Sequence, residues 1–244
     1  MKNEVHLPPP AVPKVEVPLD LLSASKVIEL QKGKNDDDIL DAMSRAAGLL
    51  TEAANHTKTA NAAIMGNQMK SATENLIAAR RRVRQIHDLA NSKVADLRDR
   101  VERKIAALEA GIQPASPRDA MQAIYAQEIR STIAKLKPED RVRACRDSIE
   151  QGDEAFIGAV VSGSPLLTGM TPTELKVVLD MWQRRHHGET VERTARLRTA
   201  QAQLDRLSGL FTNWSGGIYR EREESIARAE RSAEAASAAV DSGG

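Results

Sequence analysis

The sequence predicts an all-α protein: long helices with coiled-coil-like packing, a small module of short helices and an extended N-terminal arm. Only six of its 244 residues are aromatic, whereas 36 are alanine. Because aromatic side chains usually supply much of a centralised core, this chain must bury area mainly with Ala, Leu, Ile and Val, which suits helices packed side by side. Apolar residues recur at helical spacing over long stretches, and five prolines fall between residues 8 and 18.

The composition also narrows the class of protein. The 35 basic and 34 acidic residues leave a net charge of +1. No apolar run approaches the ~18–20 residues that cross a bilayer, and the first residues lack the apolar core of a signal peptide. The single cysteine, Cys145, excludes an internal disulfide framework and a cysteine-based metal site. We therefore expect a soluble, intracellular protein with no membrane span.

Residues 1–34 are expected to form the arm. Prolines remove backbone donors and favour extended conformations in the residues before them, so residues 8–18 suit neither a helix nor a central strand. Composition alone favours a disordered tail. The segment nevertheless carries apolar side chains at short intervals, which suits an extended arm lying along a neighbouring subunit. On this interpretation its partner-binding residues are Val12, Val15, Val17 and Leu19.

Residues 35–112 are predicted to form a long helical rod or a hairpin. Asn35 is the expected N-cap, and three aspartates at residues 36–38 suit the positive end of a helix dipole. Apolar residues then follow at helical spacing to about residue 65. Gly66 and Asn67 either end this first helix or only loosen it, and the sequence alone leaves both readings open.

The strongest periodic signal lies between residues 83 and 112. The apolar residues there are spaced 3, 4, 4, 3, 4, 4, 3 and 4, an eleven-residue repeat that keeps a narrow stripe on one side of a long helix and predicts at most a shallow right-handed supercoil. Charged residues flank the stripe, so we expect it to need a partner helix, supplied by a homo-oligomer. The residues assigned to this contact are Val83, Ile86, Val94, Leu97, Val101, Ile105 and Leu108.

Residues 113–188 are predicted to form the compact module of short helices. Prolines and glycines separate its apolar segments, and Thr171 with Glu174 forms a capping box at the start of a helix that is expected to stop near Gly188. A C-terminal long helix and a frayed tail follow over residues 189–244. The sequence around Trp214 is expected to interrupt that helix.

The densest basic cluster consists of Arg80, Arg81, Arg82 and Arg84. Basic side chains at this density can neutralise phosphates, so the cluster supports a nucleic-acid-associated scaffold or internal packaging protein as an alternative function. No aromatic side chains interleave with the arginines to stack on bases. The simpler interpretation, which the near-zero net charge favours, is a solvated face whose arginines pair with acidic residues of another helix.

Other reactive side chains form no recognisable catalytic or metal-binding pattern. His186 and His187 are adjacent, so on a helix they point about 100° apart and share one metal poorly. Cys145 lies between arginines, but no His–Asp or His–Asn set accompanies it in the same module, so we interpret it as a packed residue. We expect no enzyme activity, no metal, no cofactor and no small-molecule substrate.

One stretch carries a resemblance to a known group of proteins. Residues 150–161 form an acidic and apolar segment, and residues 164–171 continue it with a proline turn, an apolar loop and a capped helix start. This order resembles helical proteins encoded in the structural gene clusters of tailed bacteriophages. The resemblance covers about twenty residues and implies a virion-associated, non-enzymatic role. Together with the long helices and the apolar arm, it predicts a structural protein that assembles with itself and with other particle proteins, in the virion or in the host cytoplasm during assembly.

Overall fold

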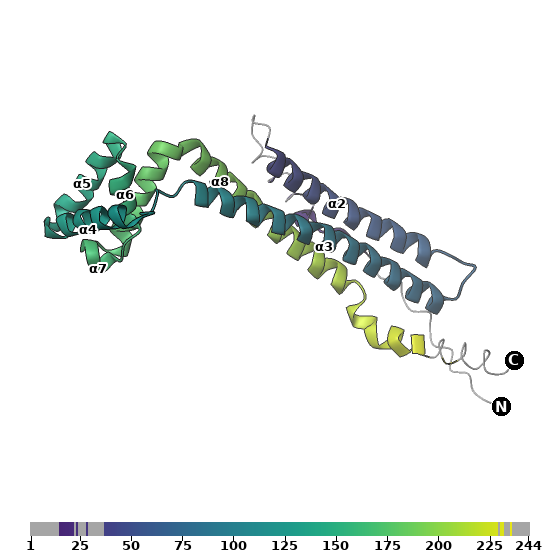
Figure 1. The fold of residues 1–244 in the computed structure, drawn as a ribbon. Helices are drawn as coiled ribbons and strands as arrows, with labels where there is room; N and C mark the ends of the chain where they lie inside the picture. The colour runs from purple at the N-terminus through teal and green to yellow at the C-terminus, as the bar shows by residue number, and fades with distance from the viewer. Residues whose placement is uncertain are drawn as a thin grey trace, which may run out of the picture. The chain divides into compact units, whose positions relative to one another are not determined.

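The computed structural model describes residues 15–21, 23, 28, 37–228, 230, 231 and 235 (Figure 1). The described residues form helices and contain no strand, which confirms the all-α prediction. In chain order, the helices are α2 (Asp38–Met65), α3 (Ala72–Gly111), α4 (Ala120–Lys135), α5 (Pro138–Gln151), α6 (Glu154–Val161), α7 (Pro165–Thr168), α8 (Pro172–Gly217) and the 3-10 helix η1 (Arg220–Arg222).

The chain divides into two compact units. Unit 1 comprises Met1–Val101 and Thr199–Gly244, and unit 2 comprises Glu102–Arg198. The divisions fall inside the long helices α3 and α8, whereas the sequence analysis placed its boundaries at residues 34, 112 and 188. Long helices continue past the edge of each packed region, so periodicity along the chain does not mark where one unit ends.

Local signals explain where unit 1 begins and ends its helices. Asp37, and not the expected Asn35, caps α2 by accepting hydrogen bonds from the amides of Ile39 (3.0 Å) and Leu40 (3.3 Å). The open question at Gly66 is resolved as a helix end, because the Gly66 amide bonds back to the Ala62 carbonyl as a C-cap. The next helix, α3, follows a capping box in which Ser71 and Glu74 bond to each other.

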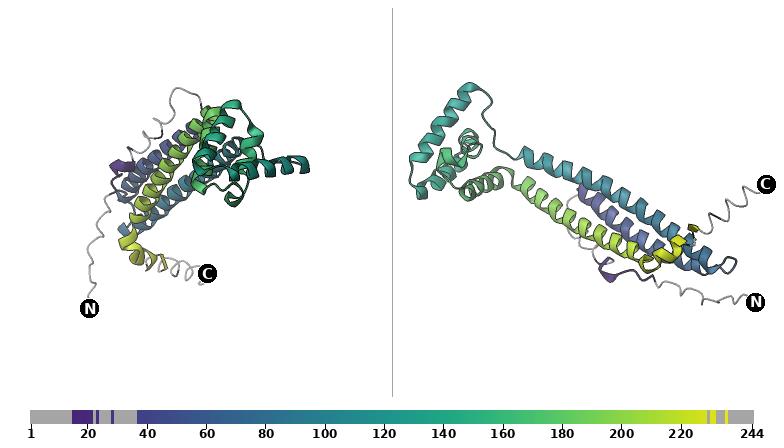
Figure 2. Two further views of the ribbon diagram at one scale, coloured as in Figure 1. Left: turned by 90° about the vertical axis from the view of Figure 1, so that its left-hand side faces the viewer. Right: turned by 90° about the horizontal axis from the view of Figure 1, so that it is seen from below.

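Unit 1 is built on α2, the first part of α3 and the last part of α8, which lie side by side (Figure 2). The eleven-residue apolar repeat forms the buried face of α3, and the supercoil expected from it stays a prediction. α2 contributes Leu40, Met43, Ala47 and Leu50 to the core, and α8 contributes Leu204, Leu207 and Phe211. Arg98 of α3 pairs with Asp205 of α8 at 2.6 Å at the edge of this contact.

Unit 2 contains the short helices expected from the sequence. Its core combines residues from four helices and one loop, namely Ala126, Ile129, Ile133, Cys145, Ile149, Ile157, Ala159, Val160, Met170, Val178 and Trp182. The predicted capping box starts α8: the Thr171 amide donates to Glu174 Oε2 (2.7 Å), and the Glu174 amide donates to Thr171 Oγ1 (3.2 Å). These bonds lower the pKa of Glu174.

Two other details of unit 2 differ from the sequence analysis. Residues 165–168 form the short helix α7 and not a loop. α8 continues through Gly188 with only one non-helical residue, His187 (φ −135°, ψ 30°), because glycine lowers helix propensity by only about 1 kcal/mol and does not break a helix that packing supports. In unit 1 the helix ends at Gly217, within the segment around Trp214 where the sequence predicts an interruption.

Candidate partner-binding surface

The apolar stripe of α3 does not lie at the surface. Val83, Ile86, Val94, Leu97, Val101 and Ile105 are each 7 % exposed or less, and Leu108 is half-buried. This corrects the expectation that the stripe needs a second molecule: in unit 1 the helices that cover it are α2 and α8 of the same chain. Side chains buried to this extent have no surface left for a partner.

The described part of the N-terminal segment contacts its own chain. The indole Nε1 of Trp214 on α8 donates to the Glu16 carbonyl (2.8 Å), and Val15 and Leu21 are buried. Val17 is half-buried, and Leu19 is 81 % exposed. Val12 lies outside the described residues. Among the predicted arm residues that the structure describes, Leu19 is therefore the one whose side chain is mostly exposed and accessible to a partner.

Two of the four arginines in the basic cluster of α3 pair with acidic side chains within unit 1. Arg80 bonds to Glu223 (3.0 Å) and to Glu230 (3.1 Å), and Arg81 lies 3.5 Å from Glu230. Arg82 donates to Gln85 on its own helix (3.4 Å). Arg80 and Arg81 therefore have the arrangement that the simpler interpretation predicted, in which arginines face acidic residues of a neighbouring segment, whereas Arg82 and Arg84 are exposed. Nucleic-acid binding by the cluster stays an untested alternative.

A polar network joins α3 to α8 within unit 1. His87 Nδ1 lies 2.7 Å from Ser215 Oγ, and Asn91 Nδ2 lies 2.9 Å from His87 Nε2. Thr212 Oγ1 donates to Asn91 Oδ1 (3.3 Å). The His87 ring also stacks on Phe211, with ring centroids 5.9 Å apart. Sequence reasoning did not single out these residues, because the four are polar positions spread over two helices more than 120 residues apart.

The directions of the hydrogen bonds indicate that this network has a structural role and not a catalytic one. Ser215 Oγ lies 2.6 Å from the Phe211 carbonyl, an acceptor only, so the hydroxyl proton is donated there. Asn91 donates to His87 Nε2, which places the proton of a neutral ring on Nδ1, from where it is donated to Ser215. The serine hydroxyl is thus held as an acceptor toward the imidazole, the reverse of what an activated serine nucleophile requires.

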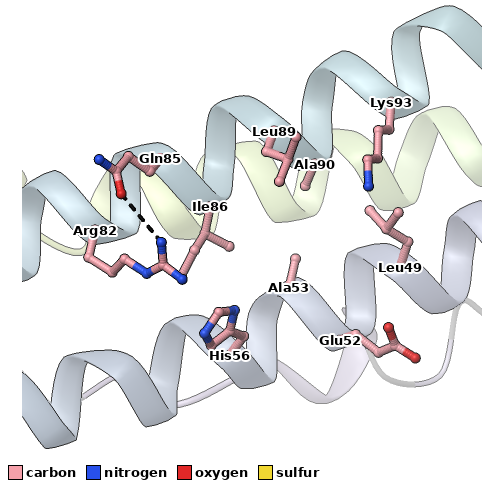
Figure 3. A pocket seen from close by; sticks show the side chains of 10 residues that line it. All are labelled: Leu49, Glu52, Ala53, His56, Arg82, Gln85, Ile86, Leu89, Ala90 and Lys93. Carbon is pink, nitrogen blue, oxygen red and sulfur yellow. Dashed lines mark hydrogen bonds between the residues drawn. The ribbon is translucent and has the colours of Figure 1, made fainter.

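A groove runs between α2 and α3 of unit 1 (Figure 3). It encloses a volume of about 490 Å³, and Ala53, Ile86 and Ala90 form part of its lining. Arg82 and Lys93 extend from α3 toward α2 at its two ends (Figure 3). Leu89 on its α3 side is 61 % exposed.

Three exposed apolar side chains of unit 2 lie close together on α4. Met121, Ile124 and Tyr125 are 76 %, 56 % and 52 % exposed, although they follow the i, i+3, i+4 spacing of a buried face. The core of the unit receives a different face of the helix, formed by Ala126, Ile129 and Ile133. At 100° per residue, the two groups are separated around the helix axis and form two distinct faces.

The exposed part of α4 also carries no charge. Residues 120–127 include no Asp, Glu, Lys or Arg, and all but Ala126 are exposed. In the whole chain, 28 % of residues are charged. The run is bounded by Arg118 and Asp119 on one side and by Glu128 on the other. An exposed apolar stripe with a charged rim is the ordinary composition of a protein–protein interface.

A hollow of about 430 Å³ borders this stripe. It lies among the segment before α4, the first turns of α4 and the start of α6, and its lining includes Pro117, Gln122, Tyr125, Ala126 and Ala155. On its edge, the Ala115 amide donates to the Glu154 carboxylate (3.0 Å). Close packing shapes this end of unit 2, because a Cβ atom at Gly158 would lie only 2.0 Å from the Ala115 carbonyl oxygen.

The described residues contain no group of three or more His, Cys, Asp or Glu side chains placed to hold a metal ion. No helix in the described part of the chain is long and apolar enough to cross a membrane. Comparison of the chain with known protein families, with curated proteins and with solved structures finds no significant match.

Proposed function

We propose that the protein is a non-enzymatic structural protein that acts by binding other proteins during the assembly of a larger particle. The observation that carries the proposal is the uncharged, exposed first half of α4, where Met121, Ile124 and Tyr125 are all more than half exposed. Apolar side chains grouped on one helix face are costly to leave in water, since each buried methylene stabilises by about 0.8 kcal/mol. A partner that covers them recovers this free energy.

The environments of Cys145 and Ser215 support a non-enzymatic role. Cys145 is buried and burial raises the pKa of its thiol to about 11, so it is a poor nucleophile near neutral pH. His87 donates its hydrogen bond to Ser215, whereas a serine nucleophile would have to donate its proton to the histidine. These groups pack and position helices, which is what an assembly component requires.

The segment that resembles tailed-bacteriophage structural proteins belongs to the same unit as the exposed stripe. Residues 150–171 fold as the end of α5, α6, α7 and the N-cap region of α8. Leu166 and Leu167 in α7 are 92 % and 54 % exposed. The resemblance favours a phage particle as the assembly, with the protein in the virion or in the host cytoplasm while the particle forms.

Association with particles tests the proposal. Particles from cells that carry the gene in its native genome would be purified on a density gradient and quantified by mass spectrometry. We expect the chain to co-sediment with the particles and its deletion to reduce the yield of complete ones. If purified particles lack the chain and form normally without it, the proposal is wrong.

A further inference from the structure

We propose that the first half of α4 pairs with the same segment of a second copy of the chain, in antiparallel orientation. This inference rests on the proposed function and names one contact through which it would operate. The occupant is a second copy because the segment is complementary to itself when reversed. In a two-fold contact, when residue i of one copy meets residue j of the other, residue j of the first copy also meets residue i of the second.

Residue 123 of α4 is the midpoint of two pairs of positions, one of which includes Arg118, two residues before the helix begins. It lies midway between Met121 and Tyr125, and also midway between Arg118 and Glu128. An antiparallel pair with its two-fold axis at this residue places Met121 of each copy opposite Tyr125 of the other. It also places Arg118 of each copy opposite Glu128 of the other, so that opposite charges meet at both ends of the apolar contact.

The parallel arrangement lacks this complementarity. There Arg118 would face a second Arg118, and Glu128 would face a second Glu128, so both ends would repel. The antiparallel arrangement additionally brings each Glu128 carboxylate toward the positive end of the partner helix dipole. Charge therefore selects the orientation, while the uncharged residues between the two ends supply the contact area.

The hollow beside Tyr125 gives the contact a place for an anchoring side chain. Tyr125, Gln122 and Pro117 line this hollow, and Met121 of the second copy would lie opposite Tyr125. A flexible methionine suits an irregular hollow of this kind. Interfaces concentrate their binding free energy in a few such apolar anchors surrounded by a polar rim.

The test is the oligomeric state of the full-length chain, measured by sedimentation equilibrium over a concentration series. We expect a reversible dimer, weakened at least about tenfold by Ile124→Asp. Ala123→Asp adds the same charge to an exposed position on the opposite side of α4 and should leave the dimer unchanged. Circular dichroism and thermal unfolding confirm that both variants fold like the parent chain.

Charge reversal tests the orientation. Arg118→Glu should weaken the dimer about three- to tenfold, and the double variant Arg118→Glu/Glu128→Arg should restore it. A dimer insensitive to Ile124→Asp, a dimer that the double change does not restore, or a chain that stays monomeric at every concentration overturns the inference. A monomeric chain that still co-sediments with particles overturns this contact alone, whereas a dimer absent from particles overturns the proposed function alone.

Discussion

His87 Nδ1 lies 2.7 Å from Ser215 Oγ, so a polar contact joins α3 and α8 beside the apolar core of unit 1. Ile86 and Ala90, the residues of the apolar stripe nearest to His87 along the sequence, are buried. Apolar contacts between helices tolerate sliding, whereas a hydrogen bond between two defined atoms does not. The network therefore fixes how α3 and α8 are aligned within unit 1, in addition to stabilising them.

Replacement of Ser215 by alanine should destabilise the protein. Ser215→Ala leaves the His87 ring without its acceptor at a half-buried position, which typically costs about 1–3 kcal/mol in the free energy of unfolding. Urea denaturation followed by circular dichroism measures the change. Ser92→Ala is the matched control, because Ser92 is an exposed serine of α3 and its replacement should change stability by less than about 0.5 kcal/mol. Equal effects of the two variants would mean that the network does not stabilise the bundle.

Leu97→Ala should destabilise the chain by roughly 2–5 kcal/mol, and by the same amount at every protein concentration. Leu97 is buried by helices of its own chain, so its loss affects a unimolecular equilibrium. A stripe buried between two molecules would instead give a midpoint that rises with concentration. Denaturation at two concentrations a hundredfold apart separates the two cases, and a concentration-dependent loss specific to Leu97→Ala would restore the intermolecular interpretation of the stripe.

The sequence predicted which face of α3 is buried but not what buries it. The spacing from Val83 to Ile105 identifies one stripe, because side chains three and four residues apart share a helix face. Whether the covering helix belongs to the same chain depends on the hairpin at Gly66 and on the return of α8 along α3. Both involve contacts between distant segments, which a local pattern does not encode. The capping box at Thr171 was predictable because it needs only four consecutive residues.

The exposed stripe of α4 could be predicted only in part. Residues 113–188 were predicted to form a compact module of short helices, but this prediction did not distinguish the exposed face of α4 from the face that carries Ile129 and Ile133, which is buried. An apolar residue is assigned to the inside by default, and only the position of the neighbouring helices reveals that one helix has two apolar faces. The polar network of His87 was missed for a related reason, because its members come together only when α3 and α8 pack.

Arg80 and Arg82 should differ in their effect on stability, although both belong to the basic cluster. Arg80→Ala removes ion pairs to Glu223 and Glu230. Because the Arg80 and Glu230 side chains are each only 20 % exposed, the loss should lower the free energy of unfolding by about 1 kcal/mol. Arg82→Ala removes only a long contact with Gln85 and should leave the melting temperature unchanged within error. The difference should shrink in high salt, which screens ion pairs.

Filter binding of DNA across a salt series is the complementary measurement. Steep salt-dependent binding that is lost in both variants would favour the nucleic-acid alternative.

Cys145 should make the stability of the protein fall as the pH rises from 8 to 10. Burial raises the pKa of its thiol from 9.0 to about 11, so in this range the folded chain holds a proton that the unfolded chain releases. The stabilisation is complete below pH 9 and is lost as the pH rises toward the folded pKa, by about 1 kcal/mol at pH 10. Denaturation of the parent chain and of Cys145→Ala at each pH isolates this contribution from that of other groups. The variant is expected to be less stable at pH 8 because of the small cavity, but its stability should fall less steeply; parallel curves would show that the thiol ionises as readily in the folded chain as in the unfolded one.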